Sequence, residues 1–272
     1  MSLSGIAMPA GGNTISIGII GLGTVGGAMY RGFKAAGCEV LGYDIDHSRS
    51  PDTLDDTLQQ GLILVSVPTP ADADGNCDLS AIHGALDSAA ILGAGGPLVL
   101  RSTVPVGTTD RLIAAYPSLK IGYSPEFLRA GSADHDFLHP PMTVYGGACP
   151  EPYFAAMKAV HGPGAGNQAV LSTTEAELLK LLLNGFAAMK TVFSSEMARL
   201  ARTANADWNK IIAIAQLEGR LGAGYLEATG PDGQPGFAGN CLPKDCRMLI
   251  QQLGAGNLLG RVMEINGRLR DS

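Results

Sequence analysis

A glycine run placed between a predicted strand and a predicted helix is the feature that most limits how this chain can fold. The segment 14–20 is short and rich in β-branched residues, and the segment 26–36 has the character of a helix. Between them the sequence reads Gly21, Leu22, Gly23, Thr24, Val25 and Gly26, which is G-x-G-x-x-G. In this context the first glycine permits a tight turn, the second lets the backbone approach a pyrophosphate, and the third allows close packing of helix on strand. The run predicts a dinucleotide-binding βαβ unit with helix-end amides facing the phosphates.

Asp44 follows the second predicted strand, residues 39–43, about 20 residues beyond the glycine run, where dinucleotide-binding domains place an acidic residue. A carboxylate at this position accepts hydrogen bonds from ribose hydroxyls and repels a 2′-phosphate, so the expected cofactor is NAD rather than NADP. The alternative is a tight turn in an α/β domain that binds no cofactor.

Further strands are predicted at 62–67, 97–100, 120–123 and 142–145, with helices at 79–92 and up to residue 115. Strands that alternate with helices predict an α/β fold, here an N-terminal Rossmann-like domain with a doubly wound parallel sheet. The strand at 142–145 is expected to complete the sheet.

The pattern changes near residue 170. The segment 173–204 contains no proline and predicts one long helix, which Thr173 or Thr174 is expected to cap. Helices are also predicted at 205–216, 242–253 and 260–269, so an all-helical central domain should follow the sheet. The expected organisation is a disordered lead-in (1–13), an NAD-binding domain (14–171) and a helical dimerisation and catalytic domain (172–272). One broad apolar face of the long helix suggests a homodimer, and it comprises Leu178, Leu181, Leu182, Phe186, Met189, Phe193, Met197 and Leu200.

Composition excludes several classes of function. A net charge of −6 argues against a general nucleic-acid binder, and no apolar run reaches the length of a membrane span. The five cysteines fit neither a disulfide framework nor a zinc site, which favours free thiols in a reducing cytoplasm. His135 and His139 are four residues apart, but no third ligand is evident, so no metal site is expected. A small molecule is therefore the expected partner, with no nucleic acid and no membrane.

Cys241 lies where the glycine-rich segment 236–240 meets a predicted helix. Helix-end amides and the adjacent Lys244 would stabilise a thiolate there, and Asp245 is close enough in sequence to act as a base. The alternative for an isolated cysteine is a small, buried packing residue, which is also the expectation for Cys246.

Four segments together resemble the UDP-glucose and related nucleotide-sugar dehydrogenases. Residues 236–245, GFAGNCLPKD, are similar to the family's G-F-G-G-x-C-L-P-K-D signature. Residues 102–108 (STVPVGT) and 124–128 (SPEFL) resemble its S-T-V-P-x-G-T turn and its N-P-E-F-L segment. Glu177, Lys180, Asn184 and Phe186 match its A-E-x-x-K-x-x-x-N-A-F helix. The motifs follow the family's order over nearly the whole chain, but the printed sequence ends before the family's C-terminal UDP-binding domain.

The resemblance implies oxidation of a sugar C6 alcohol to a carboxylate with two NAD molecules. Cys241 would attack the intermediate aldehyde, Glu126 would assist the hydrolytic water, and Lys180 would stabilise the developing oxyanion. Asn184 and Asp245 would orient water and take up protons, and Thr103 joins this catalytic set. The expected cofactor-binding residues, besides the glycine run and Asp44, are Pro68, Thr69, Ser102, Thr103 and Lys244. The expected substrate-binding residues are Glu126, Phe127, Leu128, Lys180, Asn184, Arg220, Phe237 and Gly239.

Plainer interpretations stay open for several of these residues. Lys180 and Asn184 would also fit a solvated polar stripe of a helix, Glu126 a loop carboxylate, and Arg220 a surface arginine. The chain departs from the family at Ala130, where a glutamate is usual, and at Ala238, the second glycine of the cysteine signature. Its residues 140–142 read Pro-Pro-Met in place of Pro-Asp-Arg. Two other functions are therefore retained: a non-catalytic NAD-binding relative, and a β-hydroxyacid-type dehydrogenase that needs no cysteine nucleophile.

Overall fold

The computed structural model describes residues 15–162, 166–222, 224–230 and 232–271. The predicted disordered lead-in, residues 1–13, lies outside these residues. The described chain forms two compact units. Of the described residues, the first unit comprises those in 15–69 and 78–180, and the second comprises those in 70–77 and 181–271. The division falls inside the long helix, whereas the predicted domain boundary at residue 171 precedes that helix and stays a prediction.

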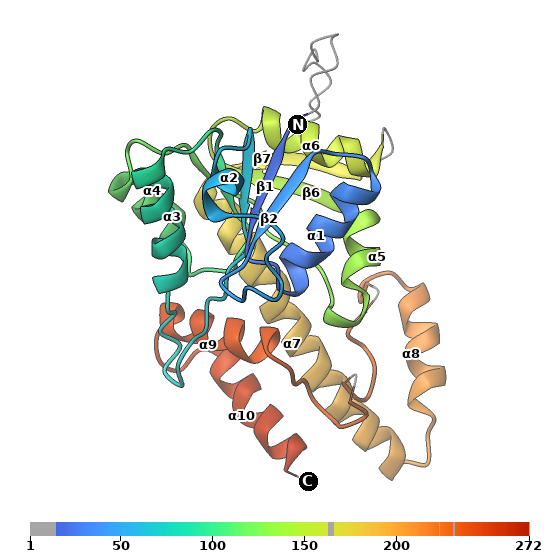
Figure 1. Cartoon of the computed structure of the whole chain (residues 1–272). Helices are drawn as coiled ribbons and strands as arrows, with labels where there is room; N and C mark the ends of the chain where they lie inside the picture. Colours follow the sequence, from blue (N-terminus) through green and yellow to red (C-terminus); the bar gives the residue numbers. More distant parts are fainter. Residues whose placement is uncertain (1–14, 163–165, 223, 231, 272) are drawn as a thin grey trace. The chain divides into compact units, whose positions relative to one another are not determined.

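A seven-stranded sheet forms the centre of the first unit, with strand order β2-β1-β3-β4-β5-β6-β7 (Figure 1). The strands are β1 (Ile17–Ile20), β2 (Val40–Tyr43), β3 (Leu62–Val65), β4 (Leu98–Leu100), β5 (Ile121–Tyr123), β6 (Met142–Gly146) and β7 (Asn167–Leu171). Strands β1 to β5 pair in parallel, as do β6 and β7. The predicted Rossmann-like α/β fold is therefore confirmed.

Helices cover both faces of this sheet, because successive strand residues point to opposite sides. Ile63 and Val65 pack with α3 (Ser80–Leu92), while Leu62 and Leu64 pack with α1 (Thr24–Ala35). Residues of α2 (Leu54–Leu58), α4 (Thr108–Ala115) and the start of the long helix join the first face, and those of α5 (Ala133–Leu138) and α6 (Glu151–His161) join the second. A single 3-10 turn, η1 (Ala130–Ser132), precedes α5. Both faces of each central strand are thus buried, which explains their continuous apolar sequence.

Two details of the predicted sheet are wrong. The strand β6 runs antiparallel to β5, through the pairing of Tyr123 with Gly146, so the sheet is not wholly parallel. A parallel connection needs a crossover helix along the sheet, but α5 has six residues and packs on α1 through Phe33 and Phe137, whose ring centroids lie 5.4 Å apart. The sheet also does not end at β6, because α6 leads to the additional strand β7.

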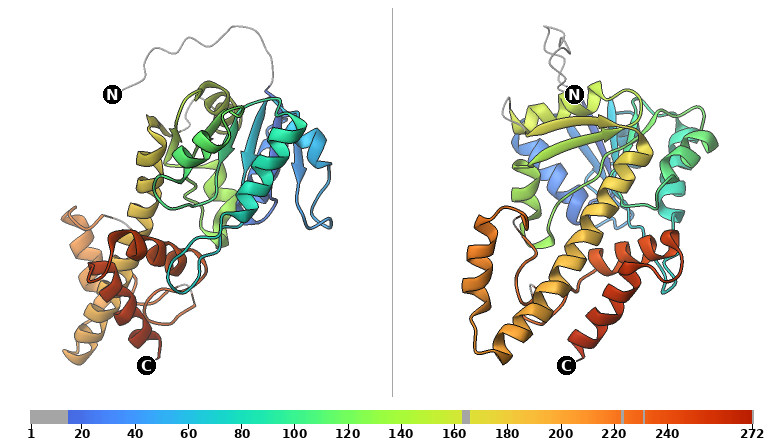
Figure 2. Two further views of the ribbon diagram at one scale, coloured as in Figure 1. Left: turned by 90° about the vertical axis from the view of Figure 1, so that its left-hand side faces the viewer. Right: turned by 180° about the vertical axis from the view of Figure 1, so that it is seen from behind.

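The long helix α7 spans Thr173–Thr203, as predicted, and is followed by α8 (Trp208–Leu217), α9 (Cys241–Leu253) and α10 (Leu258–Arg270) (Figure 2). Its first turn forms a capping box in which the Glu175 amide donates to Ser172 Oγ and the Ser172 amide donates to the Glu175 carboxylate. The predicted caps are therefore wrong, because the Thr173 and Thr174 hydroxyls donate instead to Asp110.

The apolar face predicted for α7 is largely exposed. Leu182, Phe186 and Phe193 are each more than half exposed, whereas Leu181 is fully buried. Small side chains line the buried side of the helix instead, at Ala187, Ala188, Thr191, Ser194, Ser195, Ala198 and Ala201. The helix therefore packs within its own chain through small residues and presents its large ones outward. No described helix has the length and apolarity to span a bilayer.

Candidate functional site

The first unit brings the glycine run and Asp44 together at the carboxyl ends of β1 and β2. The Leu22 amide donates to Asp44 Oδ2 at 2.7 Å, and the Asp46 amide donates to Oδ1 at 2.9 Å. The Gly21 amide donates to Tyr43 O at 2.8 Å, which fixes the two strand ends side by side. Each carboxylate oxygen keeps a further lone pair for a ribose hydroxyl. This geometry fits the NAD interpretation of Asp44.

The three glycines of the run are required for different physical reasons. Gly21 has φ of +89°, and a Cβ there would lie 2.4 Å from Ser66 O. A Cβ on Gly26 would lie 1.8 Å from Gly21 O, so only glycine allows α1 to approach the turn. Nothing lies within 4 Å of a Cβ built on Gly23, so the space beside its backbone is open. Open space at the second glycine, between two crowded ones, is what close approach of a pyrophosphate requires.

The start of α1 suits an anion. Gly23 is its N-cap residue and supplies no side-chain cap, and the first turn holds no acidic residue. The amides at this helix end therefore face a hollow of about 620 Å³, lined by Leu22, Gly23, Thr24, Arg31 and Arg49 together with residues 131–135. Arg49 is paired with Asp46 at 2.9 Å. The helix dipole and its free amides favour the negative charge of a phosphate here.

Two loops that follow β3 and β4 are tied to one another, and both carry predicted cofactor-binding residues. Thr69 Oγ1 donates to Thr103 O at 2.8 Å, and Ser102 Oγ donates to Val67 O at 2.6 Å. Pro68 lies between the bonded positions of the first loop. The structure therefore brings Pro68, Thr69, Ser102 and Thr103 together at the carboxyl edge of the sheet, where doubly wound folds bind their ligands.

A buried ion pair joins Lys180 to Glu126. Lys180 Nζ lies 2.7 Å from Glu126 Oε1 and donates to Glu126 O at 2.7 Å. The second carboxylate oxygen accepts from the Leu128 amide at 2.8 Å. The two side chains are only 5% and 10% exposed, which excludes the solvated-stripe interpretation of Lys180 and the loop-carboxylate interpretation of Glu126. The ammonium also lies 5.8 Å from the centre of the Phe127 ring.

Glu177, one turn before Lys180 on α7, is a buried carboxylate outside the predicted site residues. Oε1 accepts from the Thr109 amide and hydroxyl at 2.7 Å each, and Oε2 accepts from the Gly107 amide at 2.5 Å. These donors belong to the first turn of α4, so Glu177 caps that helix. Burial nevertheless raises the pKa of Glu177 above its usual range.

The second unit contains the cysteine segment. Cys241 is exposed and is the first residue of α9, after the N-cap Asn240. The buried Asp245 accepts from Asn184 Nδ2 at 2.5 Å, and Lys244 Nζ lies 3.0 Å from its Oδ1. Asn184, Lys244 and Asp245 are thus brought together, and Lys244 is paired with a carboxylate. Cys246 is fully buried, and burial raises its pKa to about 12, as expected of a packing residue.

The loop before Cys241 is held by buried polar contacts. Asn266 on α10 accepts from the Phe237 amide at 2.7 Å and donates to Phe237 O at 2.9 Å. Gly236 and Gly239 have φ of +80° and +84°, and nothing lies within 4 Å of a Cβ built on Gly239. The Arg220 side chain is 84% exposed in this single chain and pairs with Glu218. Its expected contact with the substrate stays a prediction.

Comparisons with known proteins agree with these observations. Residues 49–163 match the NAD binding domain of the UDP-glucose/GDP-mannose dehydrogenase family, and residues 174–268 match the central domain of that family. The UDP-glucose 6-dehydrogenase of Rickettsia bellii is 34% identical over 74% of this chain and 47% of its own length. The UDP-glucose 6-dehydrogenase of Haloferax volcanii is 27% identical over 92% of this chain and 68% of its own.

The solved structure of a UDP-glucose dehydrogenase from Pyrobaculum islandicum superposes with a TM-score of 0.80 and 26% identity, covering 97% of this chain and 70% of that one. The glycine run precedes the matched NAD-binding segment, so its assignment rests on the turn geometry described above. The chain spans about half the length of the first curated relatives it matches. The two matched domains and the shared fold show that this chain belongs to the UDP-glucose/GDP-mannose dehydrogenase family.

Proposed function

We propose that this chain oxidises the C6 alcohol of a nucleotide sugar of the UDP-glucose type to a carboxylate, with NAD as the hydride acceptor. The buried Lys180–Glu126 ion pair is the observation that best supports catalysis. A buried charge pair is costly to form, and this one lies next to Phe127 and Leu128, which the family resemblance assigns to the substrate. NAD, when bound by the glycine run and Asp44, supplies the hydride-accepting nicotinamide.

The reaction proceeds in two oxidations with a covalent stage on Cys241. The first oxidation converts the alcohol to an aldehyde, and the Cys241 thiolate adds to the aldehyde carbon to give a thiohemiacetal. In the second oxidation, the thiohemiacetal would give a hydride to a second NAD and a proton to a nearby base, which leaves a thioester. Water would then add to the thioester carbon, and cleavage of the C–S bond would release the carboxylate and the Cys241 thiolate. Covalent capture keeps the reactive aldehyde on the protein. The exposed position of Cys241 at a helix start supports this role.

Lys180 stabilises the developing oxyanion, and Glu126 assists the hydrolytic water. Two Glu126 oxygens hold the Lys180 ammonium in place. The cation is therefore already positioned before the oxyanion forms, as electrostatic stabilisation in a dry site requires. Asn184 and Asp245 orient water and take up protons, and their 2.5 Å hydrogen bond supports a shared role. A homodimer formed through the exposed apolar side of α7 completes the proposal.

Stoichiometry of NADH formation tests this function. The chain is incubated with NAD and UDP-glucose, related nucleotide sugars or short hydroxy acids, and absorbance of NADH is followed. We expect two NADH per substrate. Cys241→Ser should abolish formation of the carboxylate, while Cys149→Ser, at another exposed cysteine, should retain full activity. Lys180→Met should lower kcat by about 100-fold or more, the magnitude for loss of one oxyanion-stabilising group.

Other outcomes identify the alternative functions. One NADH per substrate with an active Cys241→Ser variant would indicate a β-hydroxyacid-type dehydrogenase. Binding of NAD, measured by calorimetry, without turnover on any substrate would indicate a non-catalytic relative.

A further inference from the structure

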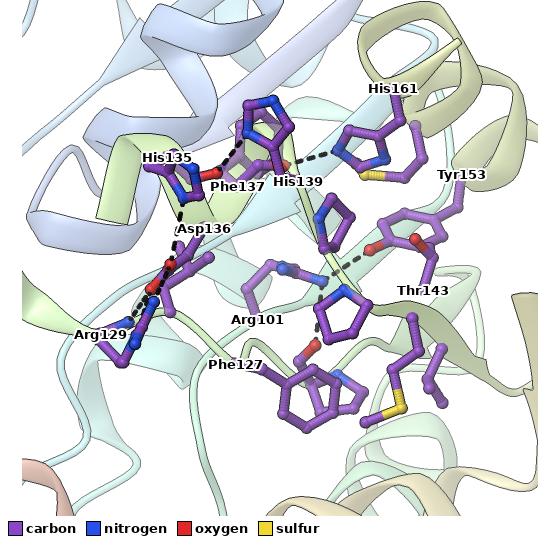
Figure 3. A pocket seen from close by; sticks show the side chains of 17 residues that line it. Arg101, Phe127, Arg129, His135, Asp136, Phe137, His139, Thr143, Tyr153 and His161 are labelled. Carbon is purple, nitrogen blue, oxygen red and sulfur yellow. Dashed lines mark hydrogen bonds and ion pairs between the residues drawn. The ribbon is translucent and has the colours of Figure 1, made fainter. Parts of the chain in front are cut away.

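A second pocket of about 270 Å³ lies in the first unit, between the loop after β5, helices α5 and α6, and the start of β6 (Figure 3). Its walls include Arg101, Phe127, Pro141, Met142, Tyr153 and His161. Among the candidate substrate-binding residues, only Phe127 and Leu128 reach it, and no residue of the glycine run does. The pocket therefore needs an explanation of its own.

Arg101 is a buried cation that lacks an anionic partner. The residue is 6% exposed, and Nη1 donates to Ser124 Oγ, to Tyr153 Oη at 2.6 Å and to Pro125 O at 3.4 Å, all of which are neutral. Its Nε is buried without a hydrogen-bond partner, and within the described ranges no carboxylate pairs with this guanidinium. Buried charges in proteins are normally paired because an isolated one is costly. Figure 3 shows Arg101 at the centre of the pocket-lining side chains.

The carboxylate of the pocket wall is already engaged elsewhere. Asp136 pairs with Arg129 at 2.7 Å and accepts from Ser132 Oγ at 2.9 Å. These contacts hold the pKa of Asp136 well below its usual range, so it is ionised and satisfied by groups other than Arg101. Asp136 thus leaves the charge of Arg101 uncompensated.

His161 adds a second polar atom with no partner. Its Nε2 lies 2.7 Å from Phe137 O, and because a carbonyl can only accept, this nitrogen carries the proton. Burial and the charge of Arg101 lower the pKa of His161, so the ring is neutral near pH 7. Nδ1 is then a buried acceptor, and among the described residues nothing donates to it. The pocket therefore offers a cation and an acceptor beside apolar side chains such as Phe127, Pro141 and Met142.

The segment 140–142 contributes apolar side chains to the pocket. Residues 140–142 read Pro-Pro-Met, and Pro141 and Met142 both line the pocket. An apolar ring therefore stands at position 141 in the same pocket as Arg101, and a carboxylate introduced there by mutation would compete for the Arg101 charge.

We propose that this pocket binds a small organic carboxylate with a short apolar body. The carboxylate would pair with Arg101, since a guanidinium forms short, charge-assisted hydrogen bonds to carboxylates. Phe127, Pro141 and Met142 would contact the apolar body. The inference concerns the first unit alone and does not depend on the proposed dehydrogenase activity.

Calorimetric titration and thermal unfolding test the site, with benzoate and butyrate as probes. We expect saturable binding of both to the wild-type chain and a rise in Tm that follows the linkage relation. Benzyl alcohol lacks the charge, and sodium chloride at equal ionic strength lacks the apolar body, so neither should reproduce the shift. Equal shifts with benzoate and chloride would overturn the proposal, because the pocket would then hold only water or a non-specific ion.

Variants locate the binding. Pro141→Asp supplies an internal carboxylate and should weaken benzoate binding at least tenfold while the chain stays folded. Arg101→Met should abolish binding, and Arg261→Gln, at an exposed arginine paired with Glu264, should bind like the wild type. If Arg101→Met does not fold, Pro141→Asp still decides the question. Unchanged affinity in a folded Pro141→Asp or Arg101→Met variant would contradict the assignment.

Discussion

Two glycines of the glycine run are required for different reasons: the fold requires Gly26, and binding of the cofactor requires Gly23. A Cβ on Gly26 collides with Gly21 O, so Gly26→Ala should destabilise the chain by about 2–3 kcal/mol through forced backbone shifts. Gly23 has φ of −68° and open space beside it, so Gly23→Ala should change stability by less than about 0.5 kcal/mol. The added methyl should nevertheless lower NAD affinity at least tenfold, because it occupies the approach of the pyrophosphate.

Chemical denaturation and calorimetry with NAD measure the two effects separately. Gly37→Ala serves as a control for backbone strain without a steric clash, because φ at Gly37 is +76° and nothing lies within 4 Å of a Cβ built there. That variant should lose some stability and keep its NAD affinity. A Gly23→Ala variant that binds NAD as well as the wild type would show that the phosphates do not lie at this turn.

Residue identities were predictable from sequence where a short motif fixes them, and their partners were not. The motif at 124–128 singled out Glu126, and the helix motif singled out Lys180, but nothing in either segment shows that the two side chains form one buried pair. Glu177 also caps α4 through contacts with Gly107 and Thr109, which are distant from it in the sequence. A charged residue within an apolar helix segment indicates a buried contact, but the sequence around Glu177 does not show which groups it contacts.

At the scale of elements, Glu177 couples α7 to α4 in a pH-dependent way. Its pKa is raised in the folded state, so the folded chain binds a proton more readily than the unfolded chain does. The stabilising effect of protonation is fully present below the usual glutamate pKa and is lost as pH rises through the raised folded-state value. Glu177→Gln removes this titration.

The free energy of unfolding of the wild type, minus that of Glu177→Gln, should therefore decrease as pH rises above about 4.5. The decrease should reach at most about 1.4 kcal/mol per pH unit. Urea denaturation at several pH values measures it. Glu175→Gln is the control, because Glu175 caps α7 itself and its pKa is lowered. The free energy of unfolding of the wild type, minus that of Glu175→Gln, should therefore increase as pH rises. Parallel curves for all three proteins would show that Glu177 has an unperturbed pKa.

Periodicity predicted most elements but not their pairing. The apolar segments at β1, β3, β4 and β5 are evident because they are buried on both faces. The strand β7 reads Asn-Gln-Ala-Val-Leu and is mostly exposed, so its sequence carries little signal. The antiparallel direction of β6 follows from how the chain between β5 and β6 packs on α1, which no local pattern encodes.

For the whole molecule, the exposed side of α7 gives a prediction about assembly. Leu182, Phe186, Phe193 and Leu200 are each more than half exposed on one helix, and a continuous exposed apolar surface is typical of an interaction site. A homodimer through this side should therefore dissociate in Phe186→Glu and Phe193→Glu, which analytical ultracentrifugation can detect. Leu217→Glu, at a residue of α8 that is 81% exposed, should leave the association unchanged. A wild-type chain that sediments as a monomer at high concentration would contradict the prediction.

One of the two edge strands of the sheet, β7, has a consequence for how this chain behaves during folding. It is an edge of the sheet, its five residues carry no charge, and Val170 is 39% exposed. Unpaired amides and carbonyls on such an edge can accept a strand from another molecule, and charged residues are the usual protection against this. Refolding yield should thus fall as protein concentration rises, with intermolecular strand addition beginning at residues 167–171.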